Sequence, residues 1–432
     1  MSIDKAILNL LLIISTTSLI SCSGGGGTPP AAGAFFNSPI QFDTSSFTNS
    51  ATGDFDGDGD ADLIVTFMGS DPGNDNVQPW QGVPIKIYLQ NASGVLEDKT
   101  SAMLTTIPSI ALARHIEVAD FNGDGADDIY FGNHGLEIGD STDWYEKDVL
   151  LLSDGAGAFN DDAMATNMPL FTGFYQTNSH NFYTHGVDST DIDNDGDIDL
   201  VINMLFGFNG LVILENDGFG VFSIKTTSAQ AELWVQFIKA DNNTSPDLFV
   251  GNGDVAGSHA ILLNDGNGNF NAGTILMPTP LLDGKVEAAE VADINGDGRD
   301  DLIIGNTNAA FTNHVVQMLI NDYDTTSSFI DETATRLPNP VAMANNYNPN
   351  FILRNLNGDG FKDLIVAKNN NAGNTEIGVY LNTNFVFTKI TALGGLSQYI
   401  AVADFNDDGL VDVVESSNSG TYVYTANTAL TN

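Results

Sequence analysis

One nine-residue pattern of acidic and amide side chains recurs six times in this chain of 432 residues. Positions 1, 3 and 5 of the pattern carry only Asp or Asn, position 6 is always Gly, and position 9 is always Asp. A seventh copy, residues 241–247, is two residues shorter and lacks the glycine. Successive copies begin about 50 to 70 residues apart, the length of one propeller blade with loop insertions. The repeat therefore predicts a ring of seven similar units.

The chemistry of each loop matches the needs of a hard cation. Oxygen-bearing side chains at alternate positions, a glycine at the sharp turn and a closing carboxylate resemble a shortened EF-hand loop, which binds Ca²⁺. Position 7 varies between acidic, basic and apolar residues, so we expect a backbone carbonyl ligand there. Mg²⁺ would need a stricter octahedron and more retained water, and Zn²⁺ would need His or Cys ligands that the loops lack. We predict about five or six structural Ca²⁺ sites.

The predicted ligands stand at positions 1, 3, 5, 7 and 9 of each loop. They are Asp54, Asp56, Asp58, Asp60 and Asp62 in the first loop; Asp120, Asn122, Asp124, Ala126 and Asp128 in the second; Asp191, Asp193, Asp195, Asp197 and Asp199 in the third; Asp293, Asn295, Asp297, Arg299 and Asp301 in the fourth; Asn355, Asn357, Asp359, Phe361 and Asp363 in the fifth; and Asp404, Asn406, Asp408, Leu410 and Asp412 in the sixth.

The alternative is that these segments are solvated Asp-Gly turns. Two unit charges about 4 Å apart repel by roughly 1 to 4 kcal/mol at effective dielectric constants of about 80 to 20. The first loop places five carboxylates in nine residues, and six repeats of one spacing favour ion binding over coincidence. The loop at Asn355 keeps only Asp359 and Asp363 as charged ligands beside Lys362, so we expect it, like the copy at Asp241, to bind weakly or to be empty.

The residues that flank the loops predict strands. Residues 116–119 and 400–403 alternate before two loops, and apolar runs such as residues 63–65 and 302–304 follow others, whereas an EF-hand would need helices there. Further on, residues 149–159, 212–222 and 261–270 read as strand, Asp-Gly turn, strand. We therefore predict an all-β fold, a seven-bladed β-propeller of four-stranded antiparallel blades. The last copy lacks a fourth strand, so we expect the N-terminal segment 35–42 to complete its blade.

The loops and the Asn-Asp-Gly-x-Gly-x-Phe hairpins together resemble FG-GAP repeats of the VCBS type, which are related to the integrin α-chain propeller. The resemblance covers nearly all of residues 36–432. It departs from the family pattern at Asp241, at Asn355 and over residues 323–329, where the hairpin glycines are missing. The resemblance implies a calcium-binding propeller whose ion loops lie on one face, with the connections after the second strands on the other.

The N-terminus predicts a lipid anchor. Residues 1–21 are similar to a bacterial lipoprotein signal peptide, with an apolar run too short to span a bilayer comfortably. The end of that run resembles a lipobox, so Cys22 is the expected lipidation site, and residues 22–34 form a Gly- and Pro-rich tether before a propeller domain over residues 35–432. The resemblance to lipoproteins implies that Ser23, rather than Asp, after the lipidated cysteine favours the outer membrane of a Gram-negative cell. The alternative is an ordinary signal peptide followed by a free cysteine.

Composition excludes two other classes of protein. The chain has 14 Lys and Arg against 56 Asp and Glu, a net charge of -42, which would repel a nucleic-acid backbone. A hydrophobic content of 42% is enough for a folded core, and one cysteine excludes a disulfide scaffold.

Function is less constrained than fold. Long insertions carry the aromatic residues Trp80, Trp144, Tyr145, Tyr175 and Tyr183, which could stack on sugars or anchor a protein partner, or could instead cap the blades' core. We expect a binding or adhesion module for a carbohydrate or protein. A polysaccharide lyase or hydrolase is the first alternative, with His115, His180, His185 or His259 as acid or base at the channel mouth, although no known catalytic motif is present. A passive spacer or assembly subunit is the second.

Overall fold

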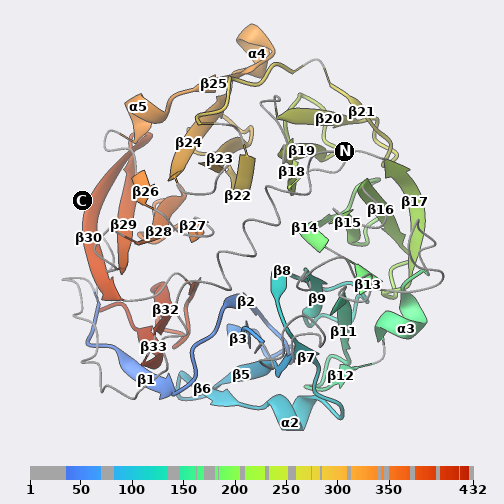
Figure 1. Cartoon of the computed structure of the whole chain (residues 1–432), viewed down its shortest axis with the longest axis vertical. Coiled ribbons are helices and arrows are strands. Elements are labelled where there is room, and N and C mark those ends of the chain that lie inside the picture. The colour runs from blue at the N-terminus through green and yellow to red at the C-terminus, as the bar shows by residue number, and fades with distance from the viewer. Residues whose placement is uncertain are drawn as a thin grey trace, which may run out of the picture.

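Seven antiparallel sheets stand around a common axis in the computed structural model (Figure 1). We number these blades 1 to 7 in chain order. Each blade begins with its inner strand, and the inner strands of successive blades contact one another around the whole ring, including the last and the first. The predicted seven-bladed propeller is therefore confirmed. The structure describes residues 36–69, 82–134, 146–161, 163–169, 181–182, 184–204, 210–228, 233–251, 259–273, 275–282, 285–308, 313–337, 342–344, 350–369, 375–395, 399–417 and 419–427.

Blades 1 to 3 each contain four strands in sequential order from the axis outward. Blade 1 consists of β2 (Asn49–Gly53), β3 (Asp62–Thr66), β5 (Lys86–Asn91) and β6 (Val95–Asp98); blade 2 of β8 (Ala113–Ala119), β9 (Asp128–Asn133), β11 (Val149–Ser153) and β12 (Phe159–Asn160); blade 3 of β14 (Thr184–Thr190), β15 (Asp199–Met204), β16 (Gly210–Asn216) and β17 (Phe222–Ser228). Two small ribbons lie beside these blades, β4 (Val83–Pro84) with β7 (Ser109–Ile110) and β10 (Glu146–Lys147) with β13 (Asn181–Phe182).

Blades 4 to 6 follow the same order. Blade 4 consists of β18 (Trp234–Ile238), β19 (Asp247–Gly251), β20 (Ala260–Asn264) and β21 (Phe270–Ala272); blade 5 of β22 (Lys285–Ala292), β23 (Asp301–Thr307), β24 (Asn313–Asn321) and β25 (Phe329–Asp331), with β26 (Ala342–Ala344) also paired to β24; blade 6 of β27 (Asn350–Arg354), β28 (Asp363–Asn369), β29 (Thr375–Thr383) and β30 (Val386–Gly395).

Blade 7 is built from both ends of the chain. Its strands β31 (Ile400–Ala403), β32 (Asp412–Ser417) and β33 (Gly420–Tyr424) are completed on the outside by β1 (Ile40–Asp43), which pairs antiparallel with β33. An isolated bridge between Phe36 and Ala426 extends this contact. The prediction that the N-terminal segment closes the last blade is confirmed.

The core lies between neighbouring blades. The second strand of a blade has blades on both sides, so every residue of β3, β9, β15, β19 and β23 is buried. This explains the continuous apolar runs after the ion loops, since a strand covered on both faces needs no alternation. Each fully buried Leu, Ile or Val contributes roughly 1.5 to 3 kcal/mol. Sheet-to-sheet packing therefore supplies most of the apolar burial.

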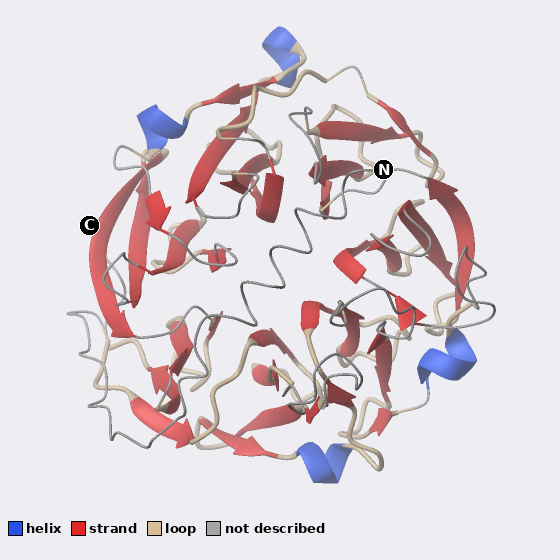
Figure 2. Ribbon diagram, in the orientation of Figure 1, coloured by secondary structure: helices blue, strands red, loops and turns tan. Residues whose placement is uncertain are grey.

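Helices are few and peripheral among the described residues (Figure 2). They are α2 (Thr100–Met103), α3 (Ala163–Asn167), α4 (Tyr323–Thr326) and α5 (Thr333–Arg336). Helix α4 occupies the place where the hairpin glycines are missing, and its C-cap residue Ser327 takes a left-handed backbone, φ 52°. No helix in the described part of the chain is long and apolar enough to cross a membrane.

One carboxylate at the end of β1 adds to the contacts that close the ring. Asp43 accepts hydrogen bonds from Tyr88 Oη at 2.6 Å and from Lys86 Nζ, both on β5 of blade 1. Burial raises the pKa of Asp43, but the bonds from Lys86 and Tyr88 together outweigh it and lower the pKa to about 2. Asp43 therefore joins the outer strand of blade 7 to blade 1.

We expect Asp43→Asn to destabilise the fold by about 1 kcal/mol at pH 7, after allowance for solvent screening. Because the folded pKa of Asp43 lies below the ordinary value of 3.8, its stabilising effect is present above that value and is lost as the pH falls toward about 2. Urea unfolding of both proteins between pH 7 and pH 2.5 measures the difference. A difference that stayed constant over this range would contradict the assignment.

Candidate metal centre

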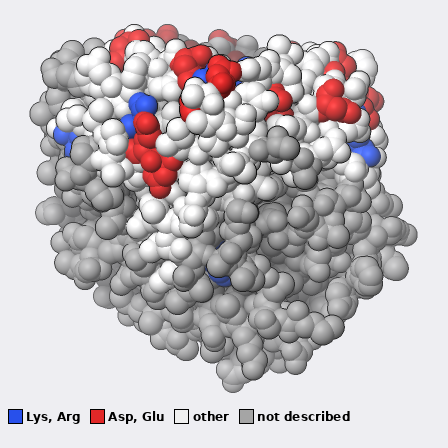
Figure 3. Space-filling model, turned by 90° about the horizontal axis from the view of Figure 1, so that it is seen from above, with Lys and Arg blue, Asp and Glu red and all other residues white. Residues whose placement is uncertain are grey.

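The six acidic loops and the seventh copy each join the first strand of a blade to the second. In blade 1, Gly53 at the end of β2 pairs with Asp62 at the start of β3, and the loop is the connection between them. The corresponding pairs recur in the other six blades. All seven connections therefore leave the ring on the same side. Figure 3 shows acidic side chains gathered along one face of the ring, at the top of that edge-on view.

The first aspartate of a loop organises the backbone around itself. Asp54 Oδ1 accepts hydrogen bonds from Gly57 N at 2.8 Å and Asp58 N at 3.0 Å, and Asp54 Oδ2 accepts one from Gly59 N at 2.9 Å. Asp120 and Asp293 make the same three bonds. At position 5, Asp58 Oδ1 accepts a bond from Asp60 N at 2.9 Å, which recurs in the five other full loops.

Two positions in each full loop require a left-handed backbone. The glycine at position 6 has φ between 81° and 101° in all six loops, a region that other residues rarely adopt. Position 4 is also left-handed, with φ between 55° and 76°. It is occupied by Gly in four loops and by Asn194 and Asp407 in the others, the types that tolerate this conformation best. Position 4 was missed in the sequence, although its restriction to Gly, Asn and Asp was visible there.

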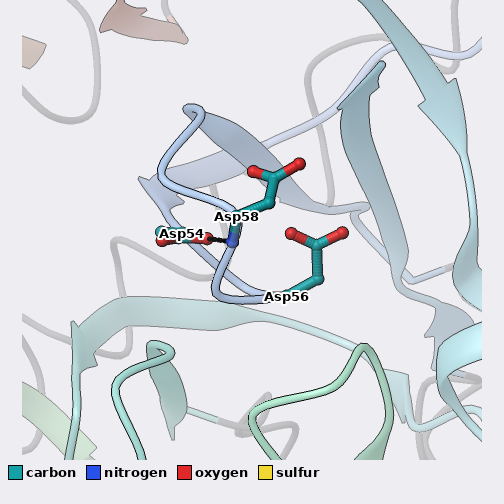
Figure 4. A group of neighbouring side chains, drawn as sticks. All are labelled: Asp54, Asp56 and Asp58. Carbon is teal, nitrogen blue, oxygen red and sulfur yellow. Dashed lines mark hydrogen bonds between the residues drawn. The ribbon is translucent and has the colours of Figure 1, made fainter. Parts of the chain in front are cut away.

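Carboxylate oxygens converge in the two loops that carry Asp at positions 1, 3 and 5. One oxygen each of Asp54, Asp56 and Asp58 lie within 4.8 Å of one another, and the third loop brings together Asp191, Asp193 and Asp195 in the same way. Figure 4 shows the first group, with the bond from Asp58 N to Asp54. Convergence of three carboxylates is unfavourable unless a cation neutralises them. These loops can therefore hold a metal ion.

The position-3 carboxylates lack hydrogen bonds that burial should require. Asp56 Oδ1 and Asp193 Oδ1 are buried and accept no hydrogen bond from the described residues. Burial, followed by the charges of Asp58 and Asp54, raises the pKa of Asp56. A buried polar oxygen without a partner costs roughly 1 to 3 kcal/mol of folding free energy, and more when it is charged. A cation bound in each loop would satisfy the oxygen of that loop.

Two loops have a basic side chain that the sequence analysis did not foresee. Lys225 Nζ lies 3.0 Å from Asp193 Oδ2, and it also contacts Glu215. Arg299, at position 7, reaches back to Asp297 at 2.9 Å and to Asp324 at 2.7 Å. In the third loop the ion pair occupies one oxygen of Asp193 and leaves Oδ1 without a partner among the described residues, whereas in the fourth loop both oxygens of Asp297 accept bonds from Arg299.

The two loops expected to bind weakly differ from the others in separate ways. Asn355 Oδ1 accepts a bond from Gly358 N at 2.8 Å but carries no charge. Phe361, at position 7 of this loop, packs edge-on against Phe385 with ring centroids 5.4 Å apart.

The copy at Asp241 is not two residues short in the structure: Ile238 pairs with Asp247 as Gly53 pairs with Asp62, so the loop has the same length and begins at Lys239. Asp241 therefore stands at position 3, where its Oδ1 accepts a bond from Asn243 N at 2.8 Å, and position 1 carries a lysine in place of a ligand. The proposed order of ion affinity stays a prediction.

The aspartate at position 9 has a structural role that the sequence analysis missed. Asp62 is 1% exposed; its Oδ2 accepts a hydrogen bond from Phe55 N in the loop, and its Oδ1 accepts one from Gln90 N on the third strand, each at 2.9 Å. Burial raises the pKa of Asp62 to about 7. Its equivalents make the same two bonds; they are Asp128, Asp199, Asp247, Asp301, Asp363 and Asp412. We call this pair of bonds the blade clasp.

Asparagines at the C-terminal ends of the third strands connect the blade clasp to the preceding blade. Asn216 Nδ2 donates to Phe121 O of blade 2 at 2.7 Å, and Asn264 Nδ2 donates to Ile192 O of blade 3 at 2.8 Å. Asn321 and Asn382 make the same bond to Ala240 O and Ile294 O, both at 3.0 Å. Each acceptor is the second residue of an ion loop. The loops are therefore linked from blade to blade, a role readable in the sequence only as the Asn of the hairpin motif.

The remaining predicted sites are outside the described residues or separated. Cys22 and the aromatic residues Trp80, Trp144, Tyr145, Tyr175 and Tyr183 lie outside the described part of the chain, as does His180. The other histidines proposed for catalysis have different neighbours: His115 lies 3.3 Å from Glu117, His185 bonds His134 with 2.7 Å between their Nε2 atoms, and His259 packs on Phe249.

Three stretches of the chain, residues 54–131, 239–304 and 355–415, match the family of FG-GAP-like repeats. The loop at Asp191 lies outside these stretches, although its backbone and carboxylates follow the same plan. A comparison with curated proteins found no match. Among solved structures, the crystal structure of BBS1N in complex with ARL6DN, soaked with lead, is similar over 92% of this chain and 98% of that chain, with 9% sequence identity and a TM-score of 0.49.

Proposed function

Because this chain is a seven-bladed β-propeller that carries FG-GAP-like repeats, we propose that it is a calcium-stabilised binding or adhesion module of the cell envelope. FG-GAP propellers commonly serve in binding and adhesion, and their loops often bind Ca²⁺. The observation that carries the calcium part is the convergence of Asp54, Asp56 and Asp58, with Asp56 Oδ1 buried and unpartnered among the described residues.

Oxygen chemistry favours Ca²⁺ over other cations at these loops. Every side chain offered at positions 1, 3 and 5 is a carboxylate or an amide, which are hard donors typical of Ca²⁺ sites. Positions 1, 3 and 5 would supply side-chain oxygens, and position 7 a backbone carbonyl. When bound, the ion would neutralise the carboxylates and fix the loops. We therefore propose that calcium is a structural component of the propeller, bound at about five or six loops.

The envelope part of the proposal rests on the N-terminal sequence. Lipidation at Cys22 would hold the propeller at a membrane, because several acyl chains anchor a protein stably whereas one chain binds only marginally. The residue that follows, Ser23, favours the outer membrane. A Gly- and Pro-rich tether over residues 22–34 would let the ring present either face to a partner. Release of the Cys22→Ser variant from the membrane fraction would support this anchor.

We expect the module to bind a carbohydrate or a protein through the aromatic insertions. An array of polysaccharides and surface proteins probed with the intact protein identifies the class of ligand, and Trp80→Ala with Trp144→Ala should then weaken binding at least tenfold, the cost of about 1.4 kcal/mol. Binding that survives both substitutions would remove this surface. Cleavage of a retained polysaccharide would indicate an enzyme instead, and no saturable ligand would indicate a spacer.

A further inference from the structure

Three inner strands carry a β-bulge at the same place, six residues before the ion loop of their blade. The register shifts between Ala113 and His115 in β8, between Thr184 and Gly186 in β14, and between Val286 and Ala288 in β22. The residues inside these bulges are Arg114, His185 and Glu287. Bulges re-aim side chains that a regular strand would direct elsewhere. All three are ionisable residues at the end of the axis opposite the ion loops.

The bulged residues of blades 2 and 5 meet each other. Arg114 Nη2 lies 2.8 Å from Glu287 Oε2, and the side chains are 17% and 4% exposed. Blades 2 and 5 are not neighbours in the ring, because blades 3 and 4 lie between them on one side and blades 6, 7 and 1 on the other. This ion pair therefore crosses the axis.

A second contact joins blades that are not neighbours, at the same end of the inner strands. The rings of His115 in blade 2 and Trp234 in blade 4 lie 5.4 Å apart, although blade 3 separates these blades. The bulged histidine of blade 3 has a different partner: His185 Nε2 lies 2.7 Å from Nε2 of His134, which follows β9 of blade 2. Side chains of blades 2, 4 and 5 thus meet at this end of the inner strands.

We infer that Arg114, His115, Trp234 and Glu287 form an axial clasp that closes the centre of the ring at the face opposite the ion loops and ties blades 2, 4 and 5 together directly. Blades of a propeller otherwise hold only their neighbours, as units of a repeat protein do. A buried ion pair gives little net stability because its desolvation is costly, but loss of one partner is expensive. The pair therefore specifies the ring's closed geometry, and any ligand approaching along the axis from this face would have to break it. This inference needs no bound calcium.

Thermal unfolding of charge variants tests the axial clasp. Arg114→Ala and Glu287→Ala should each lower the unfolding midpoint by about 5 °C, since each leaves a buried charge unpaired. The double variant should be no less stable than either single variant, and the exchange R114E with E287R should recover most of the loss. Glu97→Gln is the control, because Glu97 pairs with Lys99 at 2.7 Å on the exposed surface. If the two single losses in unfolding midpoint added up in the double variant, or if neither single variant changed the midpoint, the axial clasp would be overturned.

Fluorescence tests closure independently of stability. Replacing Trp80 and Trp144 by Phe leaves Trp234 as the only tryptophan of the three. Acrylamide should then quench Trp234 more strongly once Arg114→Ala and Glu287→Ala are both introduced, and equal quenching would contradict a closed axis. If Arg114→Ala does not fold, Arg114→Lys with Glu287→Gln preserves size and still removes the pair, and the same increase in quenching is expected.

Discussion

Removal of calcium with EGTA is expected to lower the midpoint of thermal unfolding by about 15 °C. With dissociation constants near 10 µM, about 1 mM Ca²⁺ stabilises the folded state by roughly 2.7 kcal/mol per site. Chelation removes this free energy at every loop, and it also restores repulsion between converged carboxylates such as Asp54, Asp56 and Asp58. Circular dichroism melts in Ca²⁺ and in EGTA measure the effect. A shift below about 3 °C would contradict structural calcium sites.

Single loops provide the matched control for this experiment. Asp54→Asn removes a charge from a converged loop, whereas Asp241→Asn removes one from the blade-4 loop, in which no such convergence is found among the described residues. We expect only Asp54→Asn to reduce the stabilisation by Ca²⁺, by about one site or 2 to 3 kcal/mol. Equal responses of the two variants would indicate that calcium acts outside the loops. Mg²⁺ at the same concentration should stabilise less, since these loops do not offer a regular octahedron.

Asp247→Ala is expected to destabilise the fold by about 3 kcal/mol, with the same loss in Ca²⁺ and in EGTA. Asp247 is fully buried, and its oxygens accept hydrogen bonds from Asn264 N at 2.9 Å and Ala240 N at 3.1 Å. Alanine leaves these buried backbone N–H groups without an acceptor, each at a cost of roughly 1 to 3 kcal/mol. Urea unfolding under both conditions separates the blade clasp from ion binding, because blade 4 carries the loop with the fewest predicted ligands.

The isosteric change Asp247→Asn provides the comparison. One side-chain oxygen remains to accept a bond, so the loss should be roughly half that of alanine. Asp62→Ala, in a loop with converged carboxylates, should lose more in Ca²⁺ than in EGTA if Asp62 also contributes to ion binding. A loss for Asp247→Ala that disappeared in EGTA would show that the blade clasp has no stabilising role of its own.

The fold was predictable because one local pattern repeats. Apolar runs after each loop predicted central strands, and the missing fourth strand of the last blade predicted closure by the N-terminal segment, which forms β1. The site was predictable only in part. Asp at position 9 looks like a ligand by its charge, yet its bonds to backbone N–H groups arise from burial against the third strand, which no spacing within the loop encodes.

Contacts between distant blades could not be predicted from one sequence. Arg114 and Glu287 are 173 residues apart, and nothing in their local sequence marks a bulge or a partner. Lys225 lies on the outer strand β17 of blade 3 but contacts the ion loop of the same blade through Asp193, 32 residues earlier in the chain. Such pairs depend on how the ring closes, whereas position 4 of the loops was readable and was overlooked.

The pairing of β1 with β33 also has a consequence for biosynthesis. Gln41 on β1 donates a hydrogen bond to Ser419 O, 378 positions later in the chain. Bringing these two ends of the chain together costs about 5 kcal/mol of conformational entropy before any contact compensates for it. At about 5 to 20 residues per second, the first strand emerges from the ribosome on the order of half a minute before its partner. Until then its hydrogen-bonding groups stay open to other chains. A nascent chain that stops before Gly420 should therefore aggregate or recruit chaperones more than the full chain, in which β1 can pair with β33.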